Sequence, residues 1–426
     1  MRFSLINPPW AFDQSIYFGC REAHLPLEFG YSAALLQSAG HDVEIVDGQL
    51  QQLTIADIAD RVREFRADFA VVTTAPSYLF WRCAPPELTI PRLVMDSLRG
   101  EDCWLVAVGP HASTTPRTTL AKLSADIAVM GECEEVLPML AGDLRNVPSL
   151  CYSRHGDIHL QGSPHASDMT RLPALKWDPS AIASHRHHHH RFDTDLQRKG
   201  AEMETSRGCP YHCTFCAKDN FRNSFRRRGL ATIATELDNL LDAGAEYVYF
   251  IDEIFLPFRP VLEVIAQRQI KFGIQTRIDL WSHEMIDLLG DAGCVSIEAG
   301  VESITAEGRD LLAKKCKLST VEITDRLVHA KQRVPFVQAN LLNSQCDDPA
   351  EVETWREYLQ GQGVWANKPV PLFPYPGSPD YTQRWGAPDE LAWERAHDFY
   401  LNQFDTFSDI QEQRPANLIQ LEGYCH

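Results

Sequence analysis

Three cysteines stand within eight residues of the chain, at Cys209, Cys213 and Cys216, on a stretch interrupted by Gly208 and Pro210. Cysteine thiolates are the usual ligands of iron–sulfur clusters. Three of them at this spacing can hold three irons of one [4Fe–4S] cubane and leave the fourth iron open to a small ligand. A zinc site is the alternative, but zinc sites combine such cysteines with a second, distant pair, which this sequence lacks.

The triplet, with Phe215 directly before its last cysteine, resembles the radical SAM superfamily. In that family the open iron chelates S-adenosylmethionine (SAM), and an aromatic residue at the position of Phe215 lies near the adenine. The resemblance therefore implies a catalytic cluster held by Cys209, Cys213 and Cys216, with Phe215 as a SAM contact. The reaction stays open, because the family methylates, rearranges, cyclises and oxidises.

Length, charge and cysteine content limit the number of domains and the kinds of partner that the protein can have. The chain has 426 residues, enough for two or three domains, and Asp plus Glu outnumber Lys plus Arg by 58 to 40. Such an acidic balance argues against nucleic acid as the main partner. No apolar run reaches about eighteen residues, and the chain starts with a strand-and-turn pattern. Its 12 cysteines are diluted over the chain, so we expect a cytoplasmic enzyme without a membrane span.

Residues 1 to about 140 alternate short apolar strands with helical stretches. We expect strands at 3–6, 43–46, 69–72, 104–108 and 127–130, and helices at 31–39 and 55–65. Continuous apolar strands between helices predict a doubly wound, Rossmann-like parallel sheet. In such sheets ligands bind beyond the carboxyl ends of the strands.

The loops at those strand ends resemble the cobalamin-binding domain that precedes many radical SAM domains. The resemblance implies cobalamin contacts from four loops: Asn7, Pro8, Thr73, Thr74, Gly109, Pro110, His111, Ser113, Gly131 and Glu132. The loop with His111 has one glycine before Pro-His, where family members commonly have two. We expect no histidine from an Asp-x-His-x-x-Gly motif on the cobalt. The alternative is a flavodoxin-like domain that binds another ligand or none.

Between about 141 and 200 the periodicity fades and prolines, glycines and histidines accumulate, which predicts a linker with a short strand at 147–152. A histidine-rich run occupies 185–190. Such a run can bind metals, but without cysteines or carboxylates around it a solvated loop is favoured.

From 201 to about 370 strands and helices alternate again. We expect strands at 202–205, 247–251, 272–277, 294–303 and 336–342, the last as a sixth strand, and a helix at 232–243. These units suit the partial (β/α)6, TIM-like barrel of the radical SAM superfamily, where chemistry belongs at the carboxyl ends of the strands.

Polar side chains at these strand ends have groups that suit SAM. Asp252 and Glu253 can accept hydrogen bonds, and Arg277 offers a planar fork for a carboxylate. Gly300 lacks a side chain that would keep a ligand from the backbone, and Glu302 follows it. The resemblance implies that all five contact SAM; a surface ion pair at a strand end is the alternative.

The remaining motifs are weaker. The arginines at 226–228 favour a solvated helix start over an anion site, and Cys316 and Cys346 are interpreted as spare thiols. Residues 373–381 resemble a proline-rich segment that follows the barrel in cobalamin-dependent members. With an aromatic-rich helix expected at 389–404, they predict a small helical extension over 371–426.

Together these resemblances imply a radical SAM enzyme with a [4Fe–4S] cluster, SAM and cobalamin. The leading interpretation is methylation of an unactivated carbon (or phosphinate) of a small molecule, by methylcobalamin and a 5′-deoxyadenosyl radical. An electron donor such as flavodoxin or ferredoxin is implied. One alternative keeps the cofactors but cyclises, contracts a ring or oxidises; another is a cobalamin- or iron–sulfur-based redox-sensing binding protein.

Overall fold

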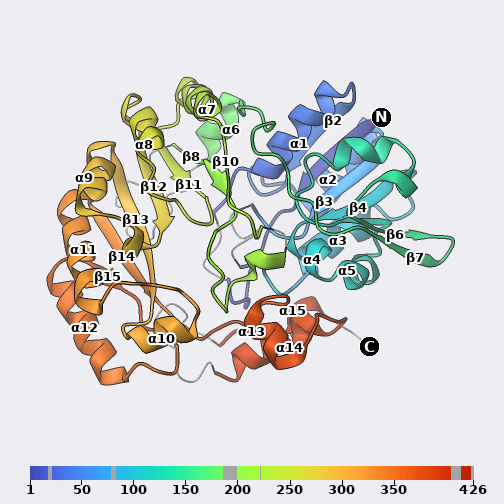
Figure 1. Ribbon diagram of the computed structural model, residues 1–426. Coiled ribbons are helices and arrows are strands. Elements are labelled where there is room, and N and C mark those ends of the chain that lie inside the picture. Colours follow the sequence, from blue (N-terminus) through green and yellow to red (C-terminus); the bar gives the residue numbers. More distant parts are fainter. Residues whose placement is uncertain (18–21, 78–82, 186–198, 221, 404–413, 424–426) are drawn as a thin grey trace.

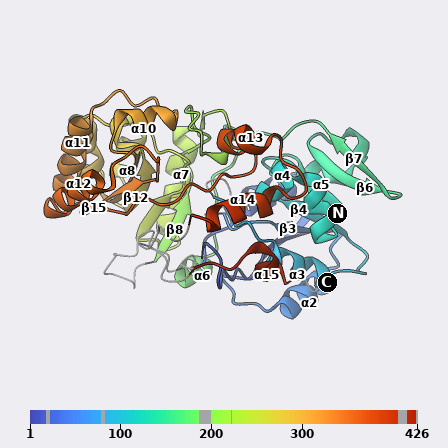
Figure 2. The same cartoon turned by 90° about the horizontal axis from the view of Figure 1, so that it is seen from below.

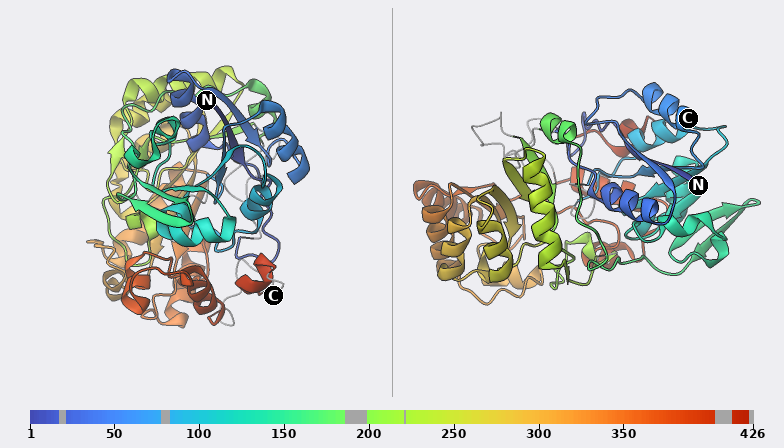
Figure 3. Two further views of the ribbon diagram at one scale, coloured as in Figure 1. Left: turned by 90° about the vertical axis from the view of Figure 1, so that its right-hand side faces the viewer. Right: turned by 90° about the horizontal axis from the view of Figure 1, so that it is seen from above.

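The computed structural model describes residues 1–17, 22–77, 83–185, 199–220, 222–403 and 414–423. Two α/β units lie side by side, with the C-terminal helices below both of them (Figure 1). The units remain side by side in the view from above (Figure 3).

The described residues of the N-terminal unit form one seven-stranded sheet in the order β2-β1-β3-β4-β5-β6-β7. β1 to β5 pair with one another in parallel, and β6 pairs antiparallel with both β5 and β7. The strands are β1 (Arg2–Asn7), β2 (Asp42–Asp47), β3 (Phe69–Thr73), β4 (Trp104–Val108), β5 (Ile127–Val129), β6 (Leu150–Arg154) and β7 (Asp157–Gln161). The predicted doubly wound sheet is confirmed, and it continues past residue 140, where the sequence predicted a linker.

Helices cover both faces of this sheet, so strands such as β3 are buried along their whole length. They are α1 (Leu27–Ser38), α2 (Ile55–Phe65), α3 (Thr89–Ser97), α4 (Pro110–Thr114) and α5 (Pro116–Leu123). The α2 helix begins at a capping box in which Thr54 and Asp57 each bond the other's backbone N–H. Short 3-10 turns follow at Leu137–Ala141 and Leu144–Asn146, and α6 (Pro179–Ser184) leads to the second unit.

The second unit contains a described parallel sheet of six strands in chain order, the open barrel that the sequence predicts. The strands are β8 (Gly200–Met203), β11 (Tyr247–Phe250), β12 (Lys271–Thr276), β13 (Cys294–Glu302), β14 (Phe336–Leu341) and β15 (Trp365–Ala366). Two details were wrong. The first strand lies two residues earlier than predicted. β14 is the fifth strand of the sheet and β15 is the sixth. The two-residue β15 was not predicted, because it has no apolar run in the sequence.

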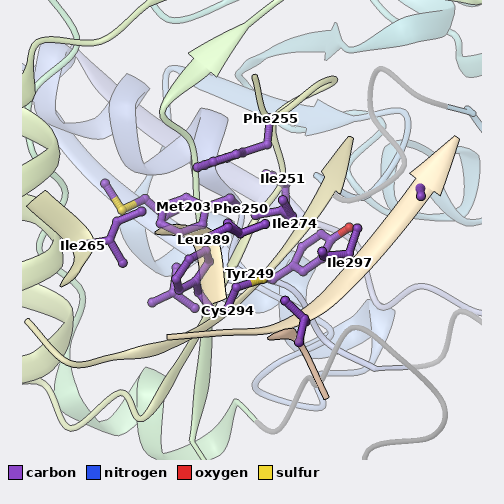
Figure 4. Close-up of a cluster of buried hydrophobic side chains, with 14 of the residues drawn as sticks. Met203, Tyr249, Phe250, Ile251, Phe255, Ile265, Ile274, Leu289, Cys294 and Ile297 are labelled. Atoms are coloured by element: carbon purple, nitrogen blue, oxygen red, sulfur yellow. The ribbon is translucent and has the colours of Figure 1, made fainter. Parts of the chain in front are cut away.

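Helices line the outside of the barrel and bury its apolar core. They are α7 (Leu230–Asp242), α8 (Arg259–Ala266), α9 (His283–Asp291), α10 (Ala306–Leu311), α11 (Thr320–Arg333) and α12 (Pro349–Gly361). Figure 4 shows part of that core, where Met203, Phe250, Ile274 and Ile297 from four strands lie together and are fully buried. A small two-stranded sheet of β9 (Ser206–Arg207) and β10 (Arg226–Arg227) stands beside the barrel.

The C-terminal segment crosses from the barrel to the N-terminal unit, as Figure 2 shows from below. Its helices are α13 (Pro379–Trp385), α14 (Ala392–Leu401) and α15 (Leu418–Glu422), so the predicted helical extension is confirmed for the described residues. Phe404 lies outside them. Within the described ranges, no helix has the length and apolar character needed to cross a membrane.

Candidate functional site

The three cysteines lie on a loop closed at its base by the antiparallel pairing of β9 and β10. Gly208, at the start of the loop, has φ +78°, and a Cβ there would lie 2.0 Å from the carbonyl oxygen of Ser224. Only glycine fits this approach. The N–H of Thr214 donates to Leu312 O at 3.1 Å, and its carbonyl accepts the N–H of Asp380 at 2.9 Å. Barrel and C-terminal segment therefore both hold the loop.

The cysteine thiols suit a cluster better than a single ion. All ten described cysteines are free, and the three of this loop are half-buried. Burial, together with the charges of neighbouring thiolates, raises the pKa of Cys209 to about 11 and that of Cys216 to about 12. Such mutually repelling thiolates need a cationic partner. A [4Fe–4S] cubane would offer each of the three cysteines its own iron.

Asp252 and Glu253, directly after β11, anchor this loop. The Asp252 carboxylate accepts the Thr205 N–H at 2.8 Å and the hydroxyls of Thr205 at 2.6 Å and Ser206 at 2.5 Å. Burial raises the pKa of Asp252 to about 7, although these hydrogen bonds oppose it. Glu253 accepts the N–H of Gly208 at 2.8 Å. Both carboxylates are thus engaged with the chain, and their contact with SAM stays a prediction.

Arg277, after β12, has one guanidinium nitrogen that could bind a ligand. Its Nε and Nη2 bind the two carboxylate oxygens of Asp279 at 3.1 and 2.7 Å, and its guanidinium lies 4.0 Å above the ring of Tyr211 in the cysteine loop. Its Nη1 is buried and has no hydrogen-bond partner in the described part of the chain. A buried, unpaired guanidinium N–H is costly, so this atom fits the predicted SAM carboxylate.

Lys314 contacts both Gly300 and Glu302, the predicted pair, and it was not predicted from the sequence. Its ammonium donates to the Gly300 carbonyl at 3.0 Å and forms an ion pair with Glu302. Glu302 has φ +65°, a rare conformation outside glycine that marks functional sites. Burial lowers the pKa of Lys314 to about 8, and Arg277 lowers it further. No local signal could have found Lys314, which follows a short helix and precedes an exposed lysine.

The loops after β1 and β3 use most of their polar atoms internally. The Asn7 amide donates to Asp47 at 2.9 Å and its oxygen accepts the indole N–H of Trp10 at 2.8 Å. The backbone of Trp10 also donates to the carbonyl of buried Pro8. The Thr73 hydroxyl donates to Ala75 O at 2.7 Å. By contrast, the Thr74 hydroxyl is buried without a hydrogen-bond partner among the described residues. This orphaned group at a strand end fits a bound cofactor.

The loops after β4 and β5 are joined to each other. Gly109 has φ +111°, and Pro110 begins α4. The hydroxyl of Ser113 donates to Gly109 O at 2.7 Å and accepts the N–H of Gly131 at 2.8 Å. A Cβ at Gly131 would lie 2.2 Å from the carbonyl oxygen of His165. Gly109 thus adopts a backbone conformation that favours glycine, and Gly131 allows a close backbone approach, at the edge where cobalamin is predicted.

His111 faces the C-terminal segment. Its ring stacks on Trp393 of α14 with centroids 4.0 Å apart, and burial lowers its pKa to about 3. The sequence does contain the letters of the Asp-x-His-x-x-Gly motif, at 157–162. They form β7, on the far side of the unit from the barrel (Figure 1), where exposed His159 stacks on Tyr152. This run is an edge strand and does not stand at the carboxyl ends of the parallel strands.

Glu132, predicted to contact cobalamin, is the centre of a buried ion-pair network between the two units. It binds Arg226 through two hydrogen bonds of 2.8 and 2.7 Å and Arg222 at 3.1 Å, and it accepts the N–H of Ser167 at 2.6 Å. Burial alone would raise its pKa, but the guanidinium groups of Arg207, Arg222 and Arg226 lower it to about 2. The loop after β5 is thus tied to both ends of the cysteine loop.

The prediction that arginines 226–228 are a solvated helix start is wrong. They belong to β10 and the residue after it, and Arg226 binds Glu132. Arg228 is buried and binds Glu236 at 2.8 Å, while the guanidinium of Arg227 lies 3.9 Å over the ring of Phe258. Tertiary partners hold these three cations, which their own sequence neighbourhood does not reveal. Of the histidine run, only His185 is described; it is buried and lies 2.8 Å from Glu202.

A cavity of about 350 Å³ lies where the two units and the C-terminal segment meet. It is lined by Ile16, Tyr17, Cys83, Phe215, Leu342, Val370, Pro371, Leu372, Phe373, Tyr375 and Tyr400. Phe215 brings the cysteine loop to this cavity, and Tyr17 and Cys83 belong to the stretches that follow β1 and β3. The cavity therefore contains one predicted SAM contact, Phe215, and two residues of the N-terminal unit.

Two family models match the chain at the two units just described. The model of the B12 binding domain matches residues 21–141, and that of the radical SAM superfamily matches residues 203–343. The chain therefore carries a radical SAM domain and a B12-binding domain. These two domains confirm the predicted set of cofactors, a [4Fe–4S] cluster, SAM and cobalamin. Which residues contact the three cofactors stays a prediction.

Relatives match over much of the chain at low identity. An uncharacterized methyltransferase of Pyrococcus horikoshii is 24% identical over 68% of this chain and 63% of its own length. The anaerobic magnesium-protoporphyrin IX monomethyl ester cyclase of Cereibacter sphaeroides is 24% identical over 83% of this chain and 59% of its own. This chain thus spans about three-fifths of the length of both relatives.

Among solved structures, the radical SAM methyltransferase TsrM from Kitasatospora setae, with cobalamin and a [4Fe–4S] cluster bound, has the same fold. It matches 89% of this chain and 73% of its own, with a TM-score of 0.67 and 18% sequence identity.

Proposed function

We propose that this protein is a cobalamin-dependent methyltransferase that acts on a small molecule. The observation that carries the proposal is the shared cavity: Phe215 of the cysteine loop and Tyr17 and Cys83 of the N-terminal unit line the same space. A substrate in it would touch the SAM side and the cobalamin side at once. When bound, the cofactors supply radical generation and the transferable methyl group.

The protein's own contribution is positioning. Cys209, Cys213 and Cys216 would hold the cluster, Arg277 and Lys314 would hold the SAM carboxylate, and the loop with Thr74 would take cobalamin. The Glu132 network supports this arrangement, because it fixes the N-terminal loop against the cysteine loop through buried ion pairs. The apolar cavity would exclude water from the reacting groups.

The first test is iron and cobalt content after anaerobic production with cobalamin supplied. We expect about four irons and one cobalt per chain, the content of one cubane and one cobalamin. The variant with Cys209, Cys213 and Cys216 all changed to alanine should lose iron and keep cobalt. Iron without cobalt in the unchanged protein would contradict the cobalamin part of the proposal.

Methyl transfer is tested by products. With substrate and reductant, SAM should yield both 5′-deoxyadenosine and S-adenosylhomocysteine, and the methyl carbon of labelled SAM should appear in the product. 5′-Deoxyadenosine without S-adenosylhomocysteine would favour a second candidate, a cyclase, ring-contracting enzyme or oxidoreductase with the same cofactors. The likeness to the Cereibacter cyclase supports that candidate. A redox-sensing binding protein would cleave no SAM.

We further propose a cytoplasmic setting and a small electron-transfer protein, such as flavodoxin or ferredoxin, as donor. The acidic chain, with its net charge of −18, supports small-molecule rather than nucleic-acid substrates.

A further inference from the structure

The lining of the cavity carries information on the substrate that the cofactor sites do not. Most of its lining residues are aliphatic or aromatic, among them Leu342, Val370, Leu372, Phe215 and Phe373. In the part of the chain that the structure describes, no Asp, Glu, Lys or Arg side chain lines it. A charged group placed there would lose its hydration without gaining a countercharge.

The polar side chains that line the cavity are Tyr17, Tyr375, Tyr400 and Cys83, and three of them form one group. The hydroxyls of Tyr17 and Tyr375 hydrogen-bond to each other, and both also interact with the thiol of Cys83. Burial raises the pKa of both tyrosines well above the usual value, so both phenols are neutral. These groups largely satisfy one another, so the cavity requires little hydrogen bonding from a ligand.

We propose that this cavity binds the reacting part of the substrate, and that this part is uncharged and largely apolar with a single hydrogen-bonding group facing Tyr17 and Tyr375. The assignment of the cavity to the substrate rests on the proposed function. The chemical class follows from the lining residues alone. The volume of about 350 Å³ falls at the lower end of the range of small-ligand sites, so a larger substrate would leave its remainder outside.

The test uses two probes with the same ring system. 2-Naphthol is uncharged with one hydroxyl, and naphthalene-2-sulfonate carries a fixed negative charge. Binding is measured by anaerobic equilibrium dialysis against the full chain loaded with its cluster and cobalamin. We expect 2-naphthol to bind at least about tenfold more tightly, because the sulfonate would have to shed water without a cation to meet it. Equal binding, or tighter binding of the sulfonate, would overturn the proposal.

Two variants place the binding in this cavity. Leu372→Lys puts a cation among the lining residues and should reverse the preference between the probes. Leu160→Lys is the matched control, since Leu160 lies half-exposed on the edge strand β7, and it should leave both affinities unchanged. If 2-naphthol binds equally to both variants, its site lies elsewhere and the proposal fails.

A milder variant guards against misfolding of the lysine variant. Tyr375→Phe keeps the ring and removes one hydroxyl, so it should weaken 2-naphthol several-fold while naphthalene binds as before. An equal loss of affinity for 2-naphthol and for naphthalene would contradict a hydrogen bond to the substrate at Tyr17 and Tyr375. Failure of this proposal is distinguishable from failure of the proposed function. Cobalt, iron and SAM cleavage report the latter, whereas probe binding reports the cavity whether or not methyl transfer occurs.

Discussion

Lys314 and Arg277 bring two cations to one place beside the cysteine loop. Arg277 spends two nitrogens on Asp279 and leaves Nη1 unpaired, while Lys314 is held by Glu302 and the Gly300 carbonyl. A lysine in this environment is costly to bury, and a bound carboxylate would repay part of that cost. We therefore assign the SAM carboxylate to this pair.

Replacing Lys314 tests this assignment. Lys314→Met should weaken SAM binding by about tenfold or more, the loss expected for a buried charged hydrogen bond. Lys315→Met is the matched control, because Lys315 is exposed at the next position, and it should bind SAM normally. Binding is measured by dialysis with radiolabelled SAM on reconstituted protein. Equal affinities of the two variants would remove Lys314 from the site.

Glu28 gives the protein a pH-dependent stability. Burial raises its pKa from 4.5 to about 7, partly opposed by the Ser77 hydroxyl, which donates to it at 2.5 Å. The charges of Glu134 and Glu204 raise the pKa further. Between pH 4.5 and about pH 7 the Glu28 carboxyl keeps a proton in the folded state that it has lost in the unfolded state. The free energy of unfolding therefore falls as pH rises through this range.

The wild type should therefore lose about 3 kcal/mol of unfolding free energy between pH 4.5 and 7 relative to Glu28→Gln. Denaturant unfolding at pH 4.5 and pH 7 measures this difference. Infrared difference spectra at pH 6 give an independent check, since the wild type should show a protonated carboxyl band that the variant lacks. A wild-type protein without that band would refute the prediction.

Among the elements, the cysteine loop depends on the backbone of Gly208. An alanine there would adopt φ +78° and meet Ser224 O at 2.0 Å. The strained conformation alone costs about 1–3 kcal/mol, and the clash must displace one strand of the β9–β10 pair. Gly208→Ala should fold but hold less than about half of the iron. Gly229→Ala is the control, because a Cβ there meets only Thr232 at 3.6 Å. Full iron loading of Gly208→Ala would contradict this view of the loop.

The Glu132 network makes a separate prediction about how the two units are joined. Glu132→Gln removes the charge that faces Arg222 and Arg226 and leaves Arg222 with Glu204 and Glu253, so it should destabilise the protein by about 2 kcal/mol, the loss expected for charged hydrogen bonds. Glu135→Gln, on the same loop, loses ion pairs with the exposed Arg171 and the partly exposed His165 and should cost about 1 kcal/mol or less. Thermal unfolding compares the two variants, and equal shifts would argue against the network as the joint.

Local sequence signals explain which elements could be predicted. The α2 helix (55–65) and β4 (104–108) match their predicted bounds, because a capping box and a continuous apolar run mark them. The two residues of β15 carry no such pattern. The site divides in the same way: the cysteine spacing is local, whereas the roles of Glu132 and Lys314 arise from partners distant in sequence.

At the scale of the whole molecule, the C-terminal segment connects what the two α/β units bring together. Asp380 bonds the cysteine loop, and Trp393 of α14 stacks on His111 and donates to Thr115 at 3.1 Å. Lys122 of α5 pairs with Glu394 and with Glu422 of α15. Tyr375 and Tyr400 of the same segment line the cavity. The segment therefore closes the cavity only while it stays bound to the N-terminal unit.

Trp393→Ala should loosen that attachment. Trp393 is only 4% exposed, and truncating a buried tryptophan typically costs about 3–5 kcal/mol. Trp393 packs in the apolar cluster of the C-terminal segment, and its ring stacking and indole hydrogen bond join that cluster to the N-terminal unit. Hydrogen exchange should therefore accelerate in α4, α5 and α14, while the barrel strands exchange as before. Trp385→Ala is the control, since Trp385 packs on Tyr381 and Phe399 within the segment itself and should leave α4 and α5 unchanged. Binding of 2-naphthol should weaken in Trp393→Ala and not in the control. Uniform acceleration across both units would mean that Trp393 supports overall stability and does not hold the cavity closed.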